Sequence, residues 1–181
     1  MRVFLALPLE SGVRKQLVGC QEAWAKMIGN VKWVEQENLH LTLKFLGEVS
    51  EQDLVAVKRA AGRVAEEFPP FSVNLSGPGV FPSVRKGRVL WVGLKDEGER
   101  LKLMAQRLDA ELAPLGFSPG KAGFTPHLTL GRLRQPAAVT IPALPVEGVP
   151  VRLTEVVLYR SVLTPHGPLY QALAEFGLGK K

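Results

Sequence analysis

The chain has 181 residues, of which 46% are hydrophobic, and its mean hydropathy is +0.07. This is the composition of an ordinary globular protein, and the length fits one large domain or two small lobes sharing a core. No apolar run reaches the roughly 18 residues that a membrane span needs. The N-terminal stretch 1–8 is interrupted by Pro8 too early for a secretory signal, and it is better explained as a strand.

Basic residues outnumber acidic ones, with 23 Lys and Arg against 17 Asp and Glu, a formal net charge of +6. Such a balance favours polyanionic partners such as nucleic acid, although it is equally compatible with a generally basic soluble protein. The single cysteine, Cys20, excludes an internal disulfide and suits a reducing compartment. We therefore expect a cytoplasmic protein that does not span a membrane.

The first half of the chain predicts strands alternating with helices. Apolar residues at helical spacing follow Ser11 and Ser50, and both serines suit the N-cap position. The predicted elements are a strand at 2–8, a helix from Ser11 to about Met27, strands at 31–34 and 40–46, and a helix from Ser50 to Phe68.

The second half repeats this mixture with more Gly and Pro between the elements. The predicted elements are a strand at 71–75, loops at 76–79 and 81–87, a strand at 88–94, a helix at about 96–112, a strand at 127–133 after a Gly- and Pro-rich approach, a strand at 151–158 that continues towards Val162, and a strand at 169–173. His166 falls in the turn before the last strand.

Short turns between neighbouring strands indicate an α+β fold with antiparallel sheets. Each half of the chain also has a helix and then a strand that begins with the same four residues. These segments start at positions 40 and 127, 87 residues apart, which is close to half of the chain. We therefore expect a bilobal protein with two pseudo-symmetric lobes, each with an antiparallel sheet and flanking helices.

The repeated segment is His-Leu-Thr-Leu, which occurs as His40–Leu43 and as His127–Leu130. Because side chains alternate faces along a strand, each histidine shares a face with the threonine two positions later, Thr42 or Thr129. One His-x-Thr arises easily by chance. However, a given histidine has roughly a 3% chance of that neighbour when a chain of this length has six threonines. Two pairs within identical tetrapeptides therefore indicate a single functional site.

Two imidazoles with ordinary pKa values near 6.5 form an acid–base pair at neutral pH. The neutral one can take a proton from an attacking water or hydroxyl, and the protonated one can give a proton to the leaving oxygen. The two hydroxyls can donate hydrogen bonds to phosphoryl oxygens as negative charge builds there. This set of groups suits in-line displacement at phosphorus without a metal.

Other chemistries have no support in the sequence. It has no His-x-x-x-His or Cys-x-x-Cys spacing, and no carboxylate cluster of the two-metal type lies near the motifs. It also lacks the Gly-x-x-x-x-Gly-Lys-Ser/Thr loop of nucleoside triphosphatases and the Gly-x-Ser-x-Gly segment of serine hydrolases. We therefore expect neither a metal nor a cofactor.

At the paired motifs, the sequence resembles the two-histidine (2H) phosphoesterase superfamily, whose signature is a pair of His-x-Thr/Ser segments. More narrowly, it is similar to the RNA 2′,3′-cyclic phosphodiesterase branch, historically called 2′-5′ RNA ligases and also LigT-like proteins. The resemblance covers nearly the whole chain, through the segments 2–9, 33–48, 77–82, 88–93, 124–132, 158–163 and 167–170.

This resemblance implies that residues 1–181 form a single domain of two intertwined lobes, with the motif strands facing each other across a central groove. It implies metal-independent opening of a ribose 2′,3′-cyclic phosphate, on an RNA end or a small nucleotide, to a 2′-phosphate. On that model His127 activates water, His40 protonates the departing 3′ oxygen, and Thr42 and Thr129 hold the phosphate. Because the two segments are alike, the residues themselves support either assignment of acid and base.

Three neighbouring residues complete the candidate site. The resemblance implies that Arg132 assists phosphate binding, although strand alternation points it away from the histidine face unless a bulge or a strand end intervenes. Phe45 could stack on a base, but it alternates onto the leucine side, where core packing is the alternative. Lys44 shares the face of His40 and could contact RNA through its charge, or it could be an ordinary surface lysine.

Two alternatives to hydrolysis remain open at this point. The same site could run in reverse and join RNA ends through a 2′-5′ linkage, with water and end concentration deciding the direction. The other alternative is a non-catalytic RNA-end binding module, against which the two titrating groups argue. Because a groove between two lobes of one chain requires no partner subunit, we expect a monomer whose partner is RNA with a 2′,3′-cyclic phosphate end, or a cyclic nucleotide.

Overall fold

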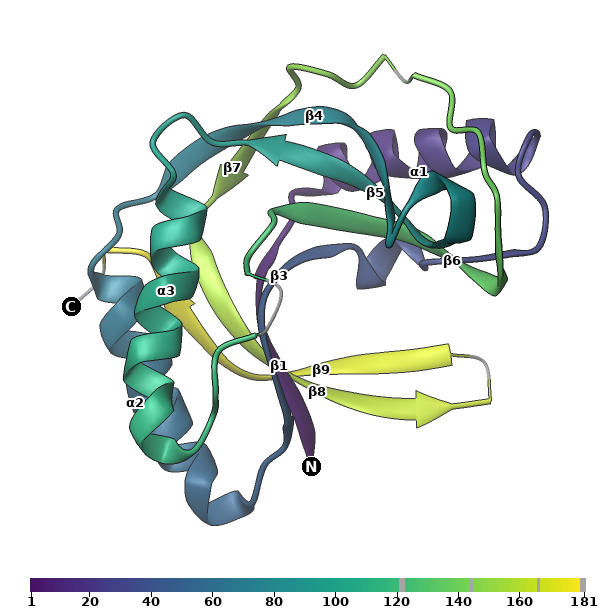
Figure 1. Cartoon of the computed structure of the whole chain (residues 1–181). Helices are drawn as coiled ribbons and strands as arrows, with labels where there is room; N and C mark the ends of the chain where they lie inside the picture. Colours follow the sequence, from purple (N-terminus) through teal and green to yellow (C-terminus); the bar gives the residue numbers. More distant parts are fainter. Residues whose placement is uncertain (121–122, 144, 166, 180–181) are drawn as a thin grey trace.

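The computed structural model describes residues 1–120, 123–143, 145–165 and 167–179 and is shown in Figure 1. The elements are, in chain order, β1 (Arg2–Pro8), α1 (Ser11–Ala25), β2 (Val31–Trp33), β3 (His40–Glu48), α2 (Glu51–Glu66), β4 (Phe71–Phe81), β5 (Gly87–Lys95), α3 (Arg100–Leu112), β6 (His127–Ala137), β7 (Pro150–Leu153), β8 (Glu155–Thr164) and β9 (Gly167–Gly177). Short 3-10 turns lie at Gln36–Asn38 (η1), Val84–Lys86 (η2) and Ala113–Leu115 (η3).

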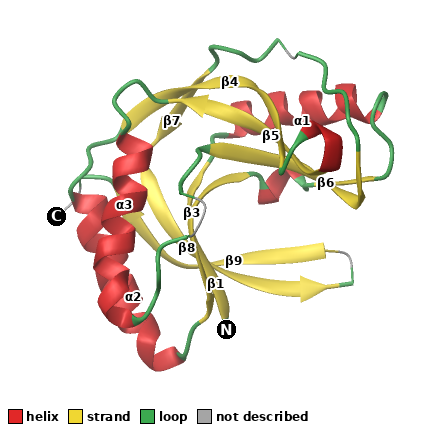
Figure 2. Ribbon diagram, viewed as in Figure 1, coloured by secondary structure: helices red, strands yellow, loops and turns green. Residues whose placement is uncertain are grey.

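Two antiparallel sheets form the two lobes. One sheet has four strands in the order β3-β1-β8-β9, and the other has five in the order β2-β6-β5-β4-β7. Helices α2 and α3 pack side by side against the first sheet, and α1 packs against β6 of the second (Figure 2). The prediction of an α+β fold with two sheet-based lobes is confirmed.

The core is built from central strands and from one face of each helix. In β1 the consecutive residues Val3–Leu7 are all buried. Helix α1 buries Val13, Leu17, Cys20 and Trp24, a spacing of three to four residues that places them on one face of a helix. Cys20 is therefore a core residue, as the sequence predicts. Within the described residues, no helix is both long and apolar enough to cross a membrane.

The two sheets repeat one three-strand unit. The order β3-β1-β8 in the first sheet corresponds to β6-β5-β4 in the second, with antiparallel pairing throughout. The motif strands also have equivalent registers, because Thr42 lies opposite Ala6 of β1, and Thr129 lies opposite Trp91 of β5. The two lobes are therefore pseudo-symmetric, as the spacing of the motifs predicts.

Strand β4 is longer than the sequence predicts. It continues to Phe81 through residues 76–79, where Gly and Pro led us to expect a loop. Pro78 can be accommodated because β7 pairs only with Phe71–Asn74, which leaves that side of β4 without a partner strand further along. Gly79 is required because a Cβ there would lie 2.0 Å from the indole of Trp91.

The predicted strand at 151–162 is two strands that belong to different sheets. It breaks at Thr154, where the chain leaves β7 at the edge of the second sheet and enters β8 in the first. A segment rich in β-branched and apolar residues predicts extended structure but does not show where a chain changes sheets. The predicted turn residue His166 lies outside the described residues.

Candidate active site

Each motif strand carries a β-bulge at its second leucine. The pairing of β3 with β1 skips Leu43, and the pairing of β6 with β5 skips Leu130. An extra residue in one strand reverses the alternation of side chains, so residues after the bulge exchange faces relative to residues before it. This local feature, present at the same position in both lobes, decides which side chains accompany the histidines.

The bulge in β6 brings Arg132 onto the face of His127. The positive charge of Arg132 lowers the pKa of both His127 and His40, so the guanidinium lies near both imidazoles. Of the two possibilities that would turn Arg132 towards the histidine face, a bulge or a strand end, the strand has the bulge. The role of Arg132 in phosphate binding stays a prediction.

The bulge in β3 has the same effect on Phe45. Phe45 is 66% exposed, and its ring lies 5.9 Å from the ring of Phe4, which is itself 5.0 Å from the ring of His40. The expectation that Phe45 alternates onto the leucine side is therefore wrong, and Phe45 lies on the face of the imidazole. Its contact with a base stays a prediction.

Lys44 is turned to the opposite side of β3 by the same bulge. It is only 7% exposed, its Nζ forms an ion pair with Asp109 of α3, and it donates a hydrogen bond of 2.9 Å to the carbonyl of Ser118. The expectations that Lys44 shares the face of His40 or lies at the surface are both wrong. It is a buried connection between β3, α3 and the segment that leads to β6.

Both imidazoles are oriented by the backbone two residues before them. Nδ1 of His40 donates to the carbonyl of Asn38, and Nδ1 of His127 donates to the carbonyl of Thr125, each at 2.7 Å. A carbonyl oxygen only accepts, so Nδ1 carries a hydrogen and the lone pair of each neutral ring is on Nε2. Both histidines therefore present Nε2 as the atom that can bind or release a proton.

The two Nε2 atoms have different partners. Nε2 of His40 lies 2.9 Å from Oγ1 of Thr42, within hydrogen-bond distance. Among the described residues, Nε2 of His127 has no hydrogen-bond partner, although Thr129 follows it in the strand as Thr42 follows His40. The proton-binding atom of His127 is thus the more open of the two.

Burial lowers the pKa of both histidines. The pKa of His40 falls to about 4, chiefly through burial; the hydrogen bond to Asn38 opposes this shift, and the charges of Arg132 and His127 add to it. The pKa of His127 is lowered in the same way by burial, against its hydrogen bond to Thr125. An anion bound beside the rings would stabilise their protonated forms and raise both pKa values.

The structure brings the two motifs into one neighbourhood. Strands β3 and β6, which belong to different sheets, contact each other. The charge of His127 also acts on His40, although 87 residues separate them in the chain. The arrangement supplies two imidazoles, two hydroxyls and one guanidinium, which together suit an anionic phosphate ester.

Aromatic rings that the sequence analysis did not single out surround the histidines. His40 lies 5.4 Å from Tyr170 of β9, in addition to its contact with Phe4. His127 lies 4.9 Å from Phe81 of β4 and 6.0 Å from Trp91 of β5. Strand alternation could not identify these rings, because the cross-strand register that places them depends on the bulges.

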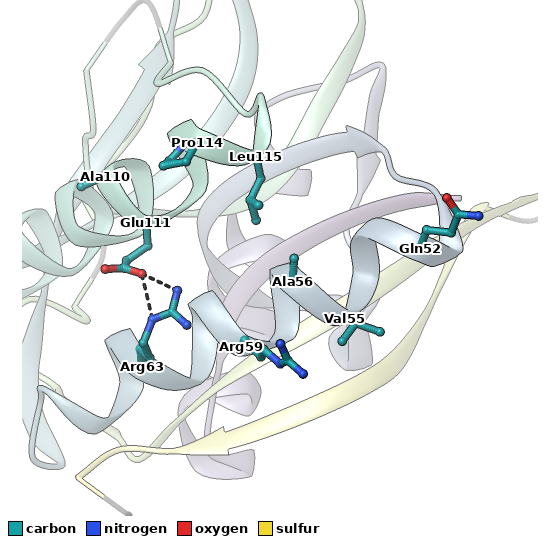
Figure 3. A pocket seen from close by; sticks show the side chains of 9 residues that line it. All are labelled: Gln52, Val55, Ala56, Arg59, Arg63, Ala110, Glu111, Pro114 and Leu115. Carbon is teal, nitrogen blue, oxygen red and sulfur yellow. Dashed lines mark hydrogen bonds and ion pairs between the residues drawn. The ribbon is translucent and has the colours of Figure 1, made fainter.

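A cavity of about 510 Å³ lies between α2 and the end of α3, on a different part of the molecule (Figure 3). Its Arg63 is already engaged by Glu111 through hydrogen bonds of 2.9 and 2.6 Å. None of the predicted site residues lines this cavity. In the described part of the chain, no group of three or more His, Cys, Asp and Glu residues could hold a metal ion.

Comparison with protein families gives one match in each half of the chain. The model of the LigT-like phosphoesterases matches residues 7–91 and again residues 92–170. A protein of Methanothermobacter thermautotrophicus named RNA 2′,3′-cyclic phosphodiesterase is 38% identical over 184 residues, which cover 98% of this chain and 99% of that protein.

Solved structures have the same architecture. A crystal structure of a Thermus thermophilus protein superposes with a TM-score of 0.89 at 34% identity, covering 99% of this chain and 98% of that chain. The structure of Escherichia coli LigT complexed with 3′-AMP superposes with a TM-score of 0.84 at 31% identity, with the same coverage of 99% and 98%.

Proposed function

Because the chain belongs to the LigT-like phosphoesterase family, we propose that it is an RNA 2′,3′-cyclic phosphodiesterase, which opens the ribose 2′,3′-cyclic phosphate of an RNA end or a small nucleotide to a 2′-phosphate. The observation that carries this proposal is the pair of imidazoles on two equivalent bulged strands. A backbone carbonyl orients each ring through Nδ1, so that Nε2 is the atom that can bind or release a proton. The names of relatives such as the Methanothermobacter protein support the choice of substrate.

In the proposed reaction His127 is the base and His40 the acid. Nε2 of His127 takes a proton from water, whose oxygen forms a new bond to phosphorus while the bond from phosphorus to O3′ breaks in line. His40 gives its Nε2 proton to O3′, leaving a free 3′-hydroxyl and a 2′-phosphate. The open Nε2 of His127 suits the base, and the low pKa of His40 makes its protonated form the stronger acid.

The bound phosphate explains how one histidine can be protonated while the other is neutral. Its non-bridging oxygens accept hydrogen bonds from Arg132, Thr42 and Thr129, and these bonds stabilise the negative charge that grows in the transition state. The bound anion raises the histidine pKa values, so one imidazole carries a proton near neutral pH although burial lowers both in the free protein. No step in this scheme requires a metal or a cofactor.

Phe45 is the proposed contact for the terminal base. Phe45 is exposed on the face of His40, and its ring packs against the ring of Phe4. Exposed aromatic rings stack on nucleic-acid bases with little sequence preference.

The proposed enzyme is a single-domain monomer of the cytoplasm. One chain contributes both histidines and the arginine, so the site needs no second subunit. The only cysteine is free and buried, which suits a reducing compartment.

Hydrolysis of an RNA oligonucleotide that ends in a 2′,3′-cyclic phosphate, measured with EDTA present, tests this proposal. We expect turnover to a 2′-phosphate by the wild type and a loss of at least about 10³-fold in kcat for His40→Ala and for His127→Ala. Arg59→Gln on the outside of α2 serves as the control. Abolition by EDTA would contradict the metal-free scheme, and full activity of both histidine variants would contradict the site.

A further inference from the structure

A row of cations extends from Arg132 away from the catalytic pair. Arg134 lies two positions further along β6 and therefore on the same face. Lys32 of β2 lies directly opposite Arg132 across the strands, so its side chain also points to that face. All three residues are exposed, and none forms an ion pair with any residue that the structure describes.

This arrangement does not stabilise the fold. Like charges that lie directly opposite each other on neighbouring strands are destabilising, and Lys32 and Arg132 are such a pair. Some basic side chains elsewhere are neutralised, as Arg107 is by Glu67. Lys32 and Arg132 instead lie side by side with no acidic partner among the described residues. An unpaired row on the face of the histidines therefore suits an anionic ligand longer than one phosphate.

The hairpin of β8 and β9 faces this row. Nζ of Lys32 lies 3.5 Å from the position that a Cβ on Gly167 would occupy, at the start of β9. Nδ2 of Asn38 donates a hydrogen bond of 2.9 Å to the carbonyl of Pro168 in the same strand. Strand β6 and this hairpin extend towards the same side of the molecule in Figure 1.

The inner face of the hairpin is aromatic and apolar. Tyr170 lies against His40, with ring centroids 5.4 Å apart. Leu163 lies opposite Pro168, and Pro168 is two positions before Tyr170 in β9. The side chains of Leu163 and Tyr170 therefore lie on the same face of the hairpin. Leu163 is a large apolar side chain that is 74% exposed.

We propose that the cation row and the hairpin form a track for the single-stranded RNA that precedes the cyclic phosphate, with the RNA phosphates on Lys32 and Arg134 and the bases against Leu163 and Tyr170. Proteins that bind single strands combine such a cationic groove with apolar or aromatic surfaces for the bases. The track rests on the proposed function and adds to it a preference for oligonucleotides over cyclic mononucleotides.

The test compares kcat/KM for a cyclic mononucleotide and for an oligonucleotide with the same terminal nucleotide. The variants are Lys32→Gln/Arg134→Gln and, as a matched control with the same charge change on the outer helices, Lys15→Gln/Arg59→Gln. We expect the wild type and the control to prefer the oligonucleotide, and this preference to fall at least about tenfold in the first variant. The salt dependence for the oligonucleotide should also weaken by about 1.4 in log–log slope, for two lost phosphate contacts.

The outcomes separate this inference from the proposed function. An unchanged preference and salt slope in Lys32→Gln/Arg134→Gln would overturn the track, as would equal losses on both substrates or a wild type without preference. If the wild type hydrolyses neither substrate, the proposed function fails. A fluorescence anisotropy titration of an oligonucleotide with a 2′-phosphate end gives an independent measure, and the double variant should bind it at least about tenfold more weakly than the control.

Discussion

The halves of the site on β3 and on β6 share one backbone design but differ in the residues that follow the bulge. In both, a carbonyl two residues earlier holds the imidazole, and the bulge reverses the strand face. After the bulge, β3 presents Phe45 to the histidine face, whereas β6 presents Arg132. The same bulge therefore presents an apolar ring in one lobe and a cation in the other, which suits the base and the phosphate of a nucleotide.

The residues directly after the two bulged leucines, Lys44 and Gly131, also differ, and they decide what surrounds each strand. Lys44 of β3 points away from the site and forms an ion pair with Asp109. The equivalent Gly131 of β6 has no side chain, and a Cβ there would lie 2.6 Å from Val31 and 2.8 Å from Trp33 of β2. This glycine allows β2 to pair with β6, which brings Lys32 beside Arg132. The extra strand of the second sheet thus has a local cause.

Apart from the histidine variants, the largest expected effect concerns Arg132, the cation in the β6 half of the site. Arg132→Gln should lower kcat/KM by about 10²–10³-fold on both a cyclic mononucleotide and an oligonucleotide, because a charge-assisted donor to the phosphate is lost in the transition state. Steady-state kinetics at a fixed pH measure this loss, with Arg59→Gln as the control. A decrease of less than about threefold would show that the two halves do not differ in phosphate binding.

The next effect concerns Lys44 and Gly131, the residues directly after the two bulged leucines. Lys44→Met should destabilise the protein by about 1–3 kcal/mol, since it leaves the carboxylate of Asp109 without its partner in a partly buried position. Gly131→Ala should cost a similar amount because the added methyl group meets Trp33 and Val31. Urea unfolding gives both values, and Lys15→Met is the control for a lysine exposed on α1. Unchanged midpoints would argue that these residues do not set the surroundings of the strands.

Loss of Phe45 in the β3 half of the site should lower kcat/KM less than loss of Arg132 in the β6 half. Phe45→Ala should raise KM about tenfold and change kcat little, because stacking on a base contributes about 1–3 kcal/mol to binding. Phe45→Tyr, which keeps the ring, should restore most of the affinity. A fall in kcat with an unchanged KM would assign the ring to positioning His40 instead of to the base.

The smallest effect is a shift in pH dependence. Burial and Arg132 lower both histidine pKa values, so the profile of kcat/KM, which reports the free enzyme, should peak below pH 6.5. Because a neighbouring cation disfavours a second positive charge, removing it in Arg132→Gln raises both pKa values, and the profile should move to higher pH. A shift to lower pH would contradict the position of Arg132 near both rings.

The sequence predicts the parts of this protein that depend on local pattern. The α+β fold, the two lobes and the pairing of His40 with Thr42 follow from helical spacing, strand alternation and the repeated tetrapeptide. Most element boundaries were predicted within a few residues, as for β3 and α2. These features need only residues that are near each other in the chain.

The parts that the sequence does not predict depend on register and on sheet-to-sheet contact. One extra residue at Leu43 moves Lys44 from the expected surface into the interior and moves Phe45 out. For Arg132, the family resemblance indicated the site and strand alternation did not; the bulge reconciles them. The aromatic neighbours of the histidines come from strands that are distant in the sequence from the motif strands, as Tyr170 of β9 is from His40 of β3.

The most direct test of the unequal roles of the two histidines uses a substrate in which sulfur replaces the departing 3′ oxygen. A thiolate is a good leaving group without protonation, so the reaction on this substrate needs a base but no acid. The account predicts that His40→Ala recovers most of its lost activity on the sulfur-containing substrate, whereas His127→Ala stays as impaired as on the normal one. Recovery of His127→Ala instead, or equal recovery of both variants, would contradict the assignment of His127 as base and His40 as acid.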